Sequence, residues 1–141
     1  MHKVLQVPRD KISTVWETIS PLIFNGLAVA PDVTVSGLAD GLVDGSIQMW
    51  IVTKDAEATA AFLTSIERDA QEWVLSLYAM SGRDAKDWVG DCHAAMDVFA
   101  QAEGCARVRM CGRKAWQRIL PEEYRVTSSR GDHLVYERVV G

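Results

Sequence analysis

The sequence predicts a single α/β (α+β) domain, residues 1–141, with a mixed, mostly antiparallel central sheet of about six to seven strands and helices on both faces. Two observations lead to this fold class. Three apolar, strand-like segments, 46–54, 58–69 and 72–80, follow one another with only short turns between them, which is typical of an antiparallel meander. A helix, a strand, a short helix and two further strands follow, and the strand–helix–strand step adds a parallel crossover.

The segment before the meander contains one strand and two helices. Residues 2–7 form a short strand. From Lys11 onward apolar residues recur at helical spacing, and Pro21 is expected to kink this helix or to end its first part. A second short helix is expected within 30–45 and ends at Gly45.

The segment after the meander begins with the clearest helix. Residues 84–102 place several apolar side chains on one helical face, and Gly104 follows as a C-terminal stop. The later elements are a half-buried strand over 105–111, a short helix over 113–120, and a hairpin of two strands over 124–129 and 133–140. All five tryptophans fall inside expected elements, so we expect them in the core, and an exposed one would mark an interface.

Composition and charge exclude several classes of protein. The net charge of −4 argues against general affinity for nucleic acid, and no apolar run approaches the ~20 residues that span a bilayer. Charged residues occupy the N-terminus where a signal peptide needs its apolar stretch, so we expect a cytoplasmic protein with reduced thiols. The sequence leaves oligomerisation open.

Four side chains that commonly bind metals are Cys92, His93, Cys105 and Cys111. Their spacing matches no pattern of paired ligands, and Cys92 lies on the apolar face of the expected helix. Cys92 and His93 are neighbours in that helix and point to different faces, which argues against a nucleophile–base pair. We therefore expect no metal site, and cysteines that pack as small apolar residues.

A short basic stretch stands out in this acidic chain. Its members are Arg107, Arg109, Arg113, Lys114 and Arg118, with no acid among them. One hypothesis is a contact surface for an anion or an acidic protein partner. The alternative is the solvated face of a strand and of the helix after it, since strand alternation alone accounts for Arg107 and Arg109.

The C-terminal third carries a resemblance to a known family. The run FAQAEGCARVRMCGRKAWQRILPEEYRV, residues 99–126, reads as helix, Gly-Cys, strand, helix and an aromatic residue that opens the next strand. Together with the order of the earlier elements, it resembles the Gcn5-related N-acetyltransferase (GNAT) fold. Its W…A…GC…GR…W…Y pattern resembles more narrowly the small GNAT-like proteins encoded by tailed bacteriophages.

The resemblance implies a place for acetyl-CoA. In active members of the family the fourth strand separates from the fifth and the cofactor lies between them. Its pyrophosphate rests on a glycine-rich loop that opens the next helix, where unpaired N–H groups favour an anion. The residues implied for cofactor binding are Leu77, Tyr78, Ala79, Ser81, Gly82, Arg83, Asp84 and Ala85. The implied candidates for a general base are Glu67, Glu72 and Tyr78, although both glutamates also fit solvated positions beside a turn.

Two departures from the family pattern oppose transferase activity. The loop has one glycine, Gly82, instead of a spaced pair, and the carboxylates of Asp84 and Asp87 are expected to take up the N–H groups of the helix start. In addition, the tyrosine that many members use as a proton donor has no counterpart in 113–120.

The sequence is therefore compatible with two functions. The first is a phage-encoded GNAT-like protein without transferase activity or cofactor, which acts through protein partners as a virion-associated or assembly protein in the host cytoplasm or virion. The alternative is an acetyl-CoA-dependent N-acetyltransferase with a degenerate pyrophosphate loop, in which Arg83 is the charge partner of the phosphates. Fold alone does not decide between them, since one fold hosts many functions.

Overall fold

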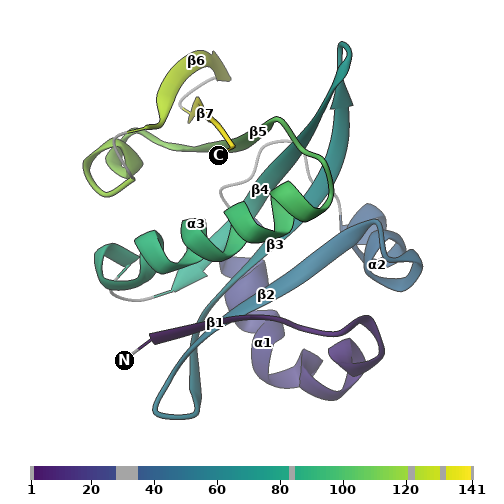
Figure 1. The fold of residues 1–141 in the computed structure, drawn as a ribbon. Helices are drawn as coiled ribbons and strands as arrows, with labels where there is room; N and C mark the ends of the chain where they lie inside the picture. The colour runs from purple at the N-terminus through teal and green to yellow at the C-terminus, as the bar shows by residue number, and fades with distance from the viewer. Residues whose placement is uncertain (1, 28–34, 83–84, 121–122, 131–132, 141) are drawn as a thin grey trace.

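The computed structural model describes residues 2–27, 35–82, 85–120, 123–130 and 133–140. Within these ranges the chain forms a seven-stranded sheet with the order β1-β2-β3-β4-β5-β7-β6 (Figure 1). The strands are β1 (His2–Gln6), β2 (Ile47–Lys54), β3 (Glu57–Asp69), β4 (Glu72–Gly82), β5 (Arg107–Arg113), β6 (Arg125–Arg130) and β7 (His133–Val139). The helices are α1 (Ile12–Leu27), α2 (Val35–Asp44) and α3 (Ala85–Ala102), with two 3-10 helices, η1 (Arg9–Lys11) and η2 (Lys114–Arg118).

The predicted fold class is confirmed. β2, β3 and β4 form the antiparallel meander, α3 crosses over to bring β5 parallel to β4, and β6 and β7 form the C-terminal hairpin. Each strand begins and ends within two residues of its expected position. In β5, for example, Val108 and Met110 are buried while Arg107 and Arg109 are half-buried, as the alternation predicts.

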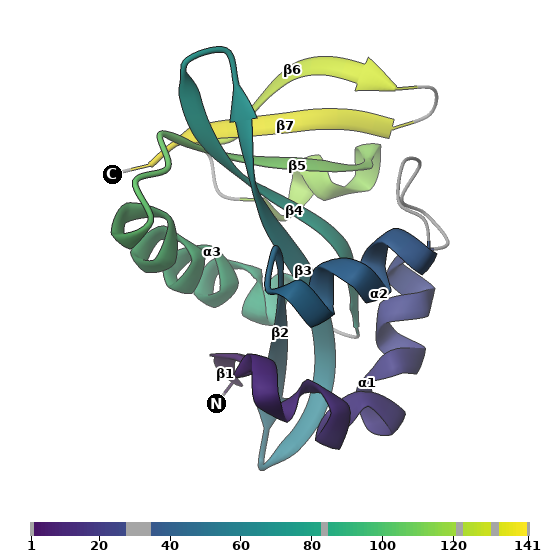
Figure 2. The same cartoon turned by 90° about the vertical axis from the view of Figure 1, so that its right-hand side faces the viewer.

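Helices cover both faces of the sheet, with α3 on one face and α1 and α2 on the other (Figure 2). The core beneath α3 includes Phe62 and Trp88. The core beneath α1 and α2 includes Ile23, Leu38 and Met49. The sheet therefore separates two apolar layers, and β2 and β3 contribute buried side chains to both.

The ends of α2 and α3 lie where the sequence predicts. Gly45 follows α2 and Gly104 follows α3, with φ angles of 85° and 75°. This left-handed region costs glycine little and other residues more, so both glycines act as helix stops. Among the helices that the structure describes, none is long and apolar enough to cross a membrane.

The structure refines two helix predictions. Of the two outcomes expected at Pro21, the end of the helix does not occur, because α1 runs on to Leu27 and Ile19 and Ile23 on either side bury the same helix face against the sheet. The helix expected over 113–120 is a 3-10 helix of five residues. Its i→i+3 hydrogen bonding is typical of such short segments.

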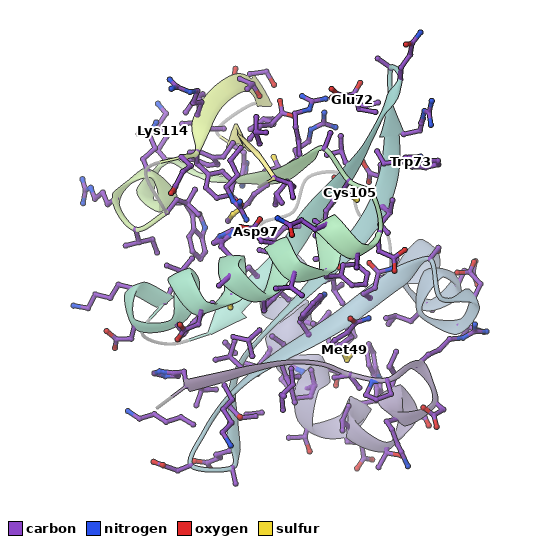
Figure 3. All side chains as sticks on the ribbon, in the orientation of Figure 1. Met49, Glu72, Trp73, Asp97, Cys105 and Lys114 are labelled. Atoms are coloured by element: carbon purple, nitrogen blue, oxygen red, sulfur yellow. The ribbon has the colours of Figure 1, made fainter. Side chains whose placement is uncertain are left out.

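Of the five tryptophans, Trp73 departs from its expected core position. It is 44% exposed, and the guanidinium of Arg68 lies 5.0 Å from its ring centroid. The others are buried (Trp50, Trp88) or half-buried (Trp16, Trp116). Figure 3 shows Trp73 beside Glu72 at the end of the sheet where β3 turns into β4.

Candidate functional site

The pairing between β4 and β5 stops part of the way along both strands. Residues 74–77 pair with residues 107–110, and beyond that point β4 continues along β3 while β5 continues along β7. The two strands diverge in both views (Figures 1 and 2). We call the diverging part, residues 78–82 and 111–113, the β4–β5 fork.

β4 contains a bulge inside the fork. The register with β3 shifts between Ala61 and Leu63, because two steps along β3 correspond to three steps along β4. The side-chain alternation shifts with it, since Leu77 and Met80, three residues apart, both enter the core beneath α3. A bulge bends its strand and redirects the backbone groups. It therefore adds to the divergence of β4 from β5.

The residues implied for cofactor binding follow the fork in order. Leu77 is the last residue of β4 that pairs with β5, and residues 78–82 form the β4 side of the fork. The side chains of Tyr78, Ala79 and Ser81 lie outside the described part of the chain, as do Arg83 and Asp84 entirely. The structure thus describes the backbone of residues 77–82, and residues 83–84 lie outside its described part.

α3 begins directly after this loop. Ala85 is its first residue and packs against the core, and Asp87 is exposed in the third helical position. An acid in the first turn stabilises a helix through the macrodipole. For the same reason the carboxylate of Asp87 disfavours a phosphate at this end of α3.

Trp116 covers β5 on the α3 side of the fork. A Cβ atom added to Gly112 would lie 2.9 Å from Cδ1 of the Trp116 ring, so only glycine fits this close approach. Trp116, Ile119 and Leu120 all pack against the core beneath α3. η2 and the residues after it therefore form an apolar wall beside the fork.

Glu72, one candidate base, lies far from the fork. It is the first residue of β4, five positions or about 17 Å of extended strand before Leu77. Its carboxylate binds Nε of Arg107 at 2.9 Å. The structure therefore argues against a catalytic role for Glu72.

Glu67 lies nearer the fork than Glu72, because it is opposite Val74, three residues before Leu77. Its carboxylate accepts hydrogen bonds from the hydroxyls of Ser65 and Ser76 at 3.2 and 3.1 Å, and Ser76 directly precedes Leu77. Glu67 is exposed, so its carboxylate is accessible from solvent. Tyr78, the third candidate, lies in the fork by its backbone.

Ion pairs join β3, β4, β5 and β7 at the paired end of the sheet. Arg107 binds Asp69, Glu72 and Glu137, and Arg109 binds Asp69 and Glu137. The hydrogen bond from Arg109 lowers the pKa of Asp69 below its usual range. Both guanidiniums already have carboxylate partners. Their positive charge is therefore largely compensated, and they are weaker binding groups for an added anion than the sequence suggests.

The rest of the basic stretch lies elsewhere. Lys114 and Arg118 are exposed on η2, and Figure 3 shows Lys114 and Glu72 toward opposite ends of β5. The side chain of Arg113 is outside the described part. The five basic residues therefore do not form one patch, and an anion or partner contact through η2 stays a prediction.

A buried polar network ties α3 to the C-terminal hairpin. Arg138 of β7 forms an ion pair with Asp97 of α3 and donates to the carbonyl oxygen of His93 at 3.3 Å. The hydroxyl of Tyr124 lies 2.7 Å from Nδ1 of His93, and Arg138 lies 5.3 Å from the Tyr124 ring centroid. Figure 3 shows Asp97 reaching from α3 toward the C-terminal strands.

This network is not among the features predicted from the sequence. Its signal is the alternation of β7, in which Tyr136 and Arg138 occupy successive buried positions on one face. A charged residue at a core position of a strand requires a buried partner. Arg138 could therefore have been singled out from its register alone, but its partners could not.

The protonation of His93 follows from its surroundings. Burial, and then the charge of Arg138, lower the pKa of His93 to about 3. Burial raises the pKa of Tyr124, so the phenol keeps its proton, and the direction of its hydrogen bond with Nδ1 of the neutral His93 is set by the imidazole tautomer. Nε2 of His93 has no hydrogen-bond partner among the described atoms.

Replacing His93 with glutamine is expected to flatten the pH dependence of stability between about pH 6 and pH 4. In this range the unfolded chain binds a proton on His93, with its ordinary pKa of 6.5, and the folded chain does not. The wild type therefore loses up to ~1.4 kcal/mol of stability per pH unit as the pH falls. Urea unfolding at several pH values measures the slopes, and parallel curves for H93Q and the wild type would contradict a neutral buried His93.

The environments of Cys92 and Cys105 are those of unreactive thiols. Burial raises the pKa of Cys92 to about 12 and also raises the pKa of Cys105. High thiol pKa values disfavour the thiolate that attacks substrates and binds metals. The described residues include no group of three or more potential metal ligands.

Comparison with solved structures gives matches over the whole chain. An acetyltransferase of the GNAT family from Staphylococcus aureus Mu50 matches with a TM-score of 0.65 and 8% identity over 100% of both chains. The PaiA N-acetyltransferase from Thermoplasma acidophilum, solved with coenzyme A, matches with a TM-score of 0.60 and 9% identity over 99% of each chain. N-acetylglutamate synthase from Neisseria gonorrhoeae, solved with coenzyme A and N-acetyl-glutamate, matches with a TM-score of 0.64 and 11% identity, and this chain covers 35% of its length.

No protein-family model and no curated protein matches the sequence. At such low identities, structural similarity carries the fold and leaves the activity to be argued from the site. The strand order, the parallel β4–β5 pairing that ends early and the matches over the full chain agree with one another. The chain therefore has the fold of the GNAT acetyltransferases.

Proposed function

We propose that this chain is an acetyl-CoA-dependent N-acetyltransferase whose cofactor lies in the β4–β5 fork. The observation that carries the proposal is the early end of the β4–β5 pairing, after which both strands continue and β4 leads toward the start of α3. Two structural neighbours, PaiA and N-acetylglutamate synthase, are solved with coenzyme A. The early end of the pairing and these neighbours support a transferase better than a role without cofactor.

The fork suits a molecule with amide groups along an extended arm. Backbone amides at a diverging strand edge can hydrogen-bond to such an arm in place of a neighbouring strand. Residues 77–79 would hold the pantetheine arm, and residues 81–85 the pyrophosphate, with Arg83 as its charge partner. When bound, acetyl-CoA supplies an acetyl group activated as a thioester.

The chain itself would supply a base for the acceptor. Glu67, held by the hydroxyls of Ser65 and Ser76, would accept the proton of the acceptor amine directly or through one water molecule. Glu72 is left out of this scheme because it is paired with Arg107 far from the fork.

Titration with acetyl-CoA tests the proposal. We expect saturable binding by calorimetry with a Kd below ~100 µM, and a rise in the melting temperature at saturating ligand. ATP is a matched control ligand, because it carries phosphates and adenine but no pantetheine arm. If acetyl-CoA at about 1 mM neither binds nor stabilises the protein, the transferase proposal fails.

Replacing Asp87 with asparagine is expected to tighten acetyl-CoA binding by about 2- to 5-fold at low ionic strength. The substitution removes a negative charge from the exposed first turn of α3, beside the implied position of the pyrophosphate. Calorimetry of the variant measures the change. D91N, a similar exposed substitution one turn later on α3, is the control and should leave the Kd unchanged. Equal affinities for D87N and the wild type would place the phosphates away from this helix end.

A protein-contact role without transfer is the second candidate. It is favoured by the pairing of Glu72 with Arg107 and by the absence of tyrosine from residues 113–120. In this case the chain would act as a virion-associated or assembly protein of a phage. Mass spectrometry of purified virions tests it, and absence of the chain would exclude a role in the mature particle.

A further inference from the structure

A hollow of about 730 Å³ lies between the start of α1 and the end of α2. Its lining includes the apolar side chains of Ile12, Trp16, Leu42 and Val43, with Arg9 and Asp10 among the polar ones. These residues belong to η1, α1 and α2, and no described residue of β4, β5 or α3 lines it. This α1–α2 hollow is therefore separate from the β4–β5 fork.

The hollow is part of an exposed apolar surface. Leu42 is buried at its floor, Trp16 is half-buried in its wall, and Val43 is 73% exposed at its edge. Along α1 the surface continues from Trp16 to Phe24, whose rings meet edge to face at 5.9 Å. Phe24 is itself 44% exposed. Exposed apolar area of this kind beside charged residues is typical of a protein interface.

The shape and charge of this surface suit a copy of itself. A two-fold dimer brings the same patch of both subunits together, so the patch must be complementary to itself. Val43 projects beside a hollow that can receive it, and the small side chain of Ala39, four residues earlier on α2, allows helices to approach closely. Arg9 and Asp10 are adjacent charges of opposite sign, so each can face the other across a two-fold axis.

We propose that a second copy of this chain docks on the α1–α2 hollow. Val43 of each copy enters the hollow of the other, and Arg9 of one copy faces Asp10 of the other at the rim. The hollow is several times larger than one valine side chain, so the exposed face of α2 around Val43 enters with it. This inference does not depend on acetyl-CoA binding, and a failed titration leaves it untouched.

Sedimentation velocity over a range of protein concentrations tests the proposal. The wild type is expected to show a reversible monomer–dimer equilibrium. V43E should raise the dimer Kd at least 10-fold, because it places a charge in the apolar contact. V98E is a matched control, since Val98 is equally exposed on α3, at 72%, and should leave the Kd unchanged. Neither substitution touches a buried side chain, so both variants are expected to fold.

Charge exchange at the rim tests the orientation of the two copies. R9D is expected to weaken the dimer about 2- to 5-fold, as exposed ion pairs contribute little. The double variant R9D/D10R restores opposite charges across the axis and should recover the wild-type Kd. A wild type that stays monomeric up to ~1 mM, or equal effects of V43E and V98E, would overturn the proposal. So would a monomer whose hollow binds an apolar dye that V43E displaces, since the occupant would then be a small molecule.

Discussion

Replacing Trp88 with alanine is expected to lower the free energy of unfolding by about 3–5 kcal/mol. Trp88 is completely buried in the core beneath α3, where it belongs to the same cluster as Leu77 and Met80. Alanine would remove the apolar area of the ring and leave a cavity beneath the first turns of the helix that follows the fork. Urea unfolding, followed by circular dichroism, measures the loss.

Trp73 provides the matched control for this substitution. It is 44% exposed and contacts the guanidinium of Arg68, so W73A should cost at most about 1 kcal/mol. The two variants delete the same side chain from a buried and from an exposed position of one protein. A loss for W88A no larger than the loss for W73A would contradict the assignment of Trp88 to the core.

Replacing Arg138 with methionine is expected to destabilise the fold by about 2–3 kcal/mol. Methionine keeps the apolar stem of the side chain but leaves the Asp97 carboxylate without its cation and removes the side-chain hydrogen bond to the His93 carbonyl. Breaking a buried ion pair costs about 3–5 kcal/mol, and the value is lower here because the Asp97 side chain is 32% exposed. The midpoint and slope of urea unfolding report the change.

A double-mutant cycle separates the ion pair from packing. D97L/R138M removes both charges, so we expect it to lose less stability than the sum of D97L and R138M, by about 1–3 kcal/mol. R118M serves as the control, because Arg118 is exposed on η2 and should change stability by less than ~0.5 kcal/mol. Strict additivity of the two single variants would show that Arg138 and Asp97 do not interact energetically.

Periodicity predicted the elements because burial repeats along the chain within each of them. The meander, the crossover through α3 and the C-terminal hairpin all followed from local patterns. The β4–β5 fork could not be predicted from local patterns. β4 is one continuous apolar strand, and the residue at which its pairing with β5 ends depends on a strand about 30 residues later in the sequence. It was expected only through the resemblance to the GNAT fold.

Local patterns also fail to predict which charged residues form ion pairs. Alternation put Arg107 and Arg109 on the polar face of β5, but their partners Asp69 and Glu137 come from β3 and β7. No short-range pattern connects residues so far apart in the sequence. The expected core position of Trp73 was wrong for a related reason, because the sequence does not distinguish a strand-end position next to a turn from a central position in the strand.

The short β4–β5 ladder also sets the order in which the sheet assembles. β2, β3 and β4 pair through tight turns, whereas β4 and β5 join residues more than 30 positions apart through four residue pairs. Distant contacts of this kind form slowly because a long loop must close first. Until β5 arrives, β4 presents an apolar strand with an open edge, which is the surface that neighbouring chains pair with during aggregation. The short pairing that leaves β4 and β5 diverging in the finished sheet therefore makes β4 the segment through which incompletely folded copies would associate.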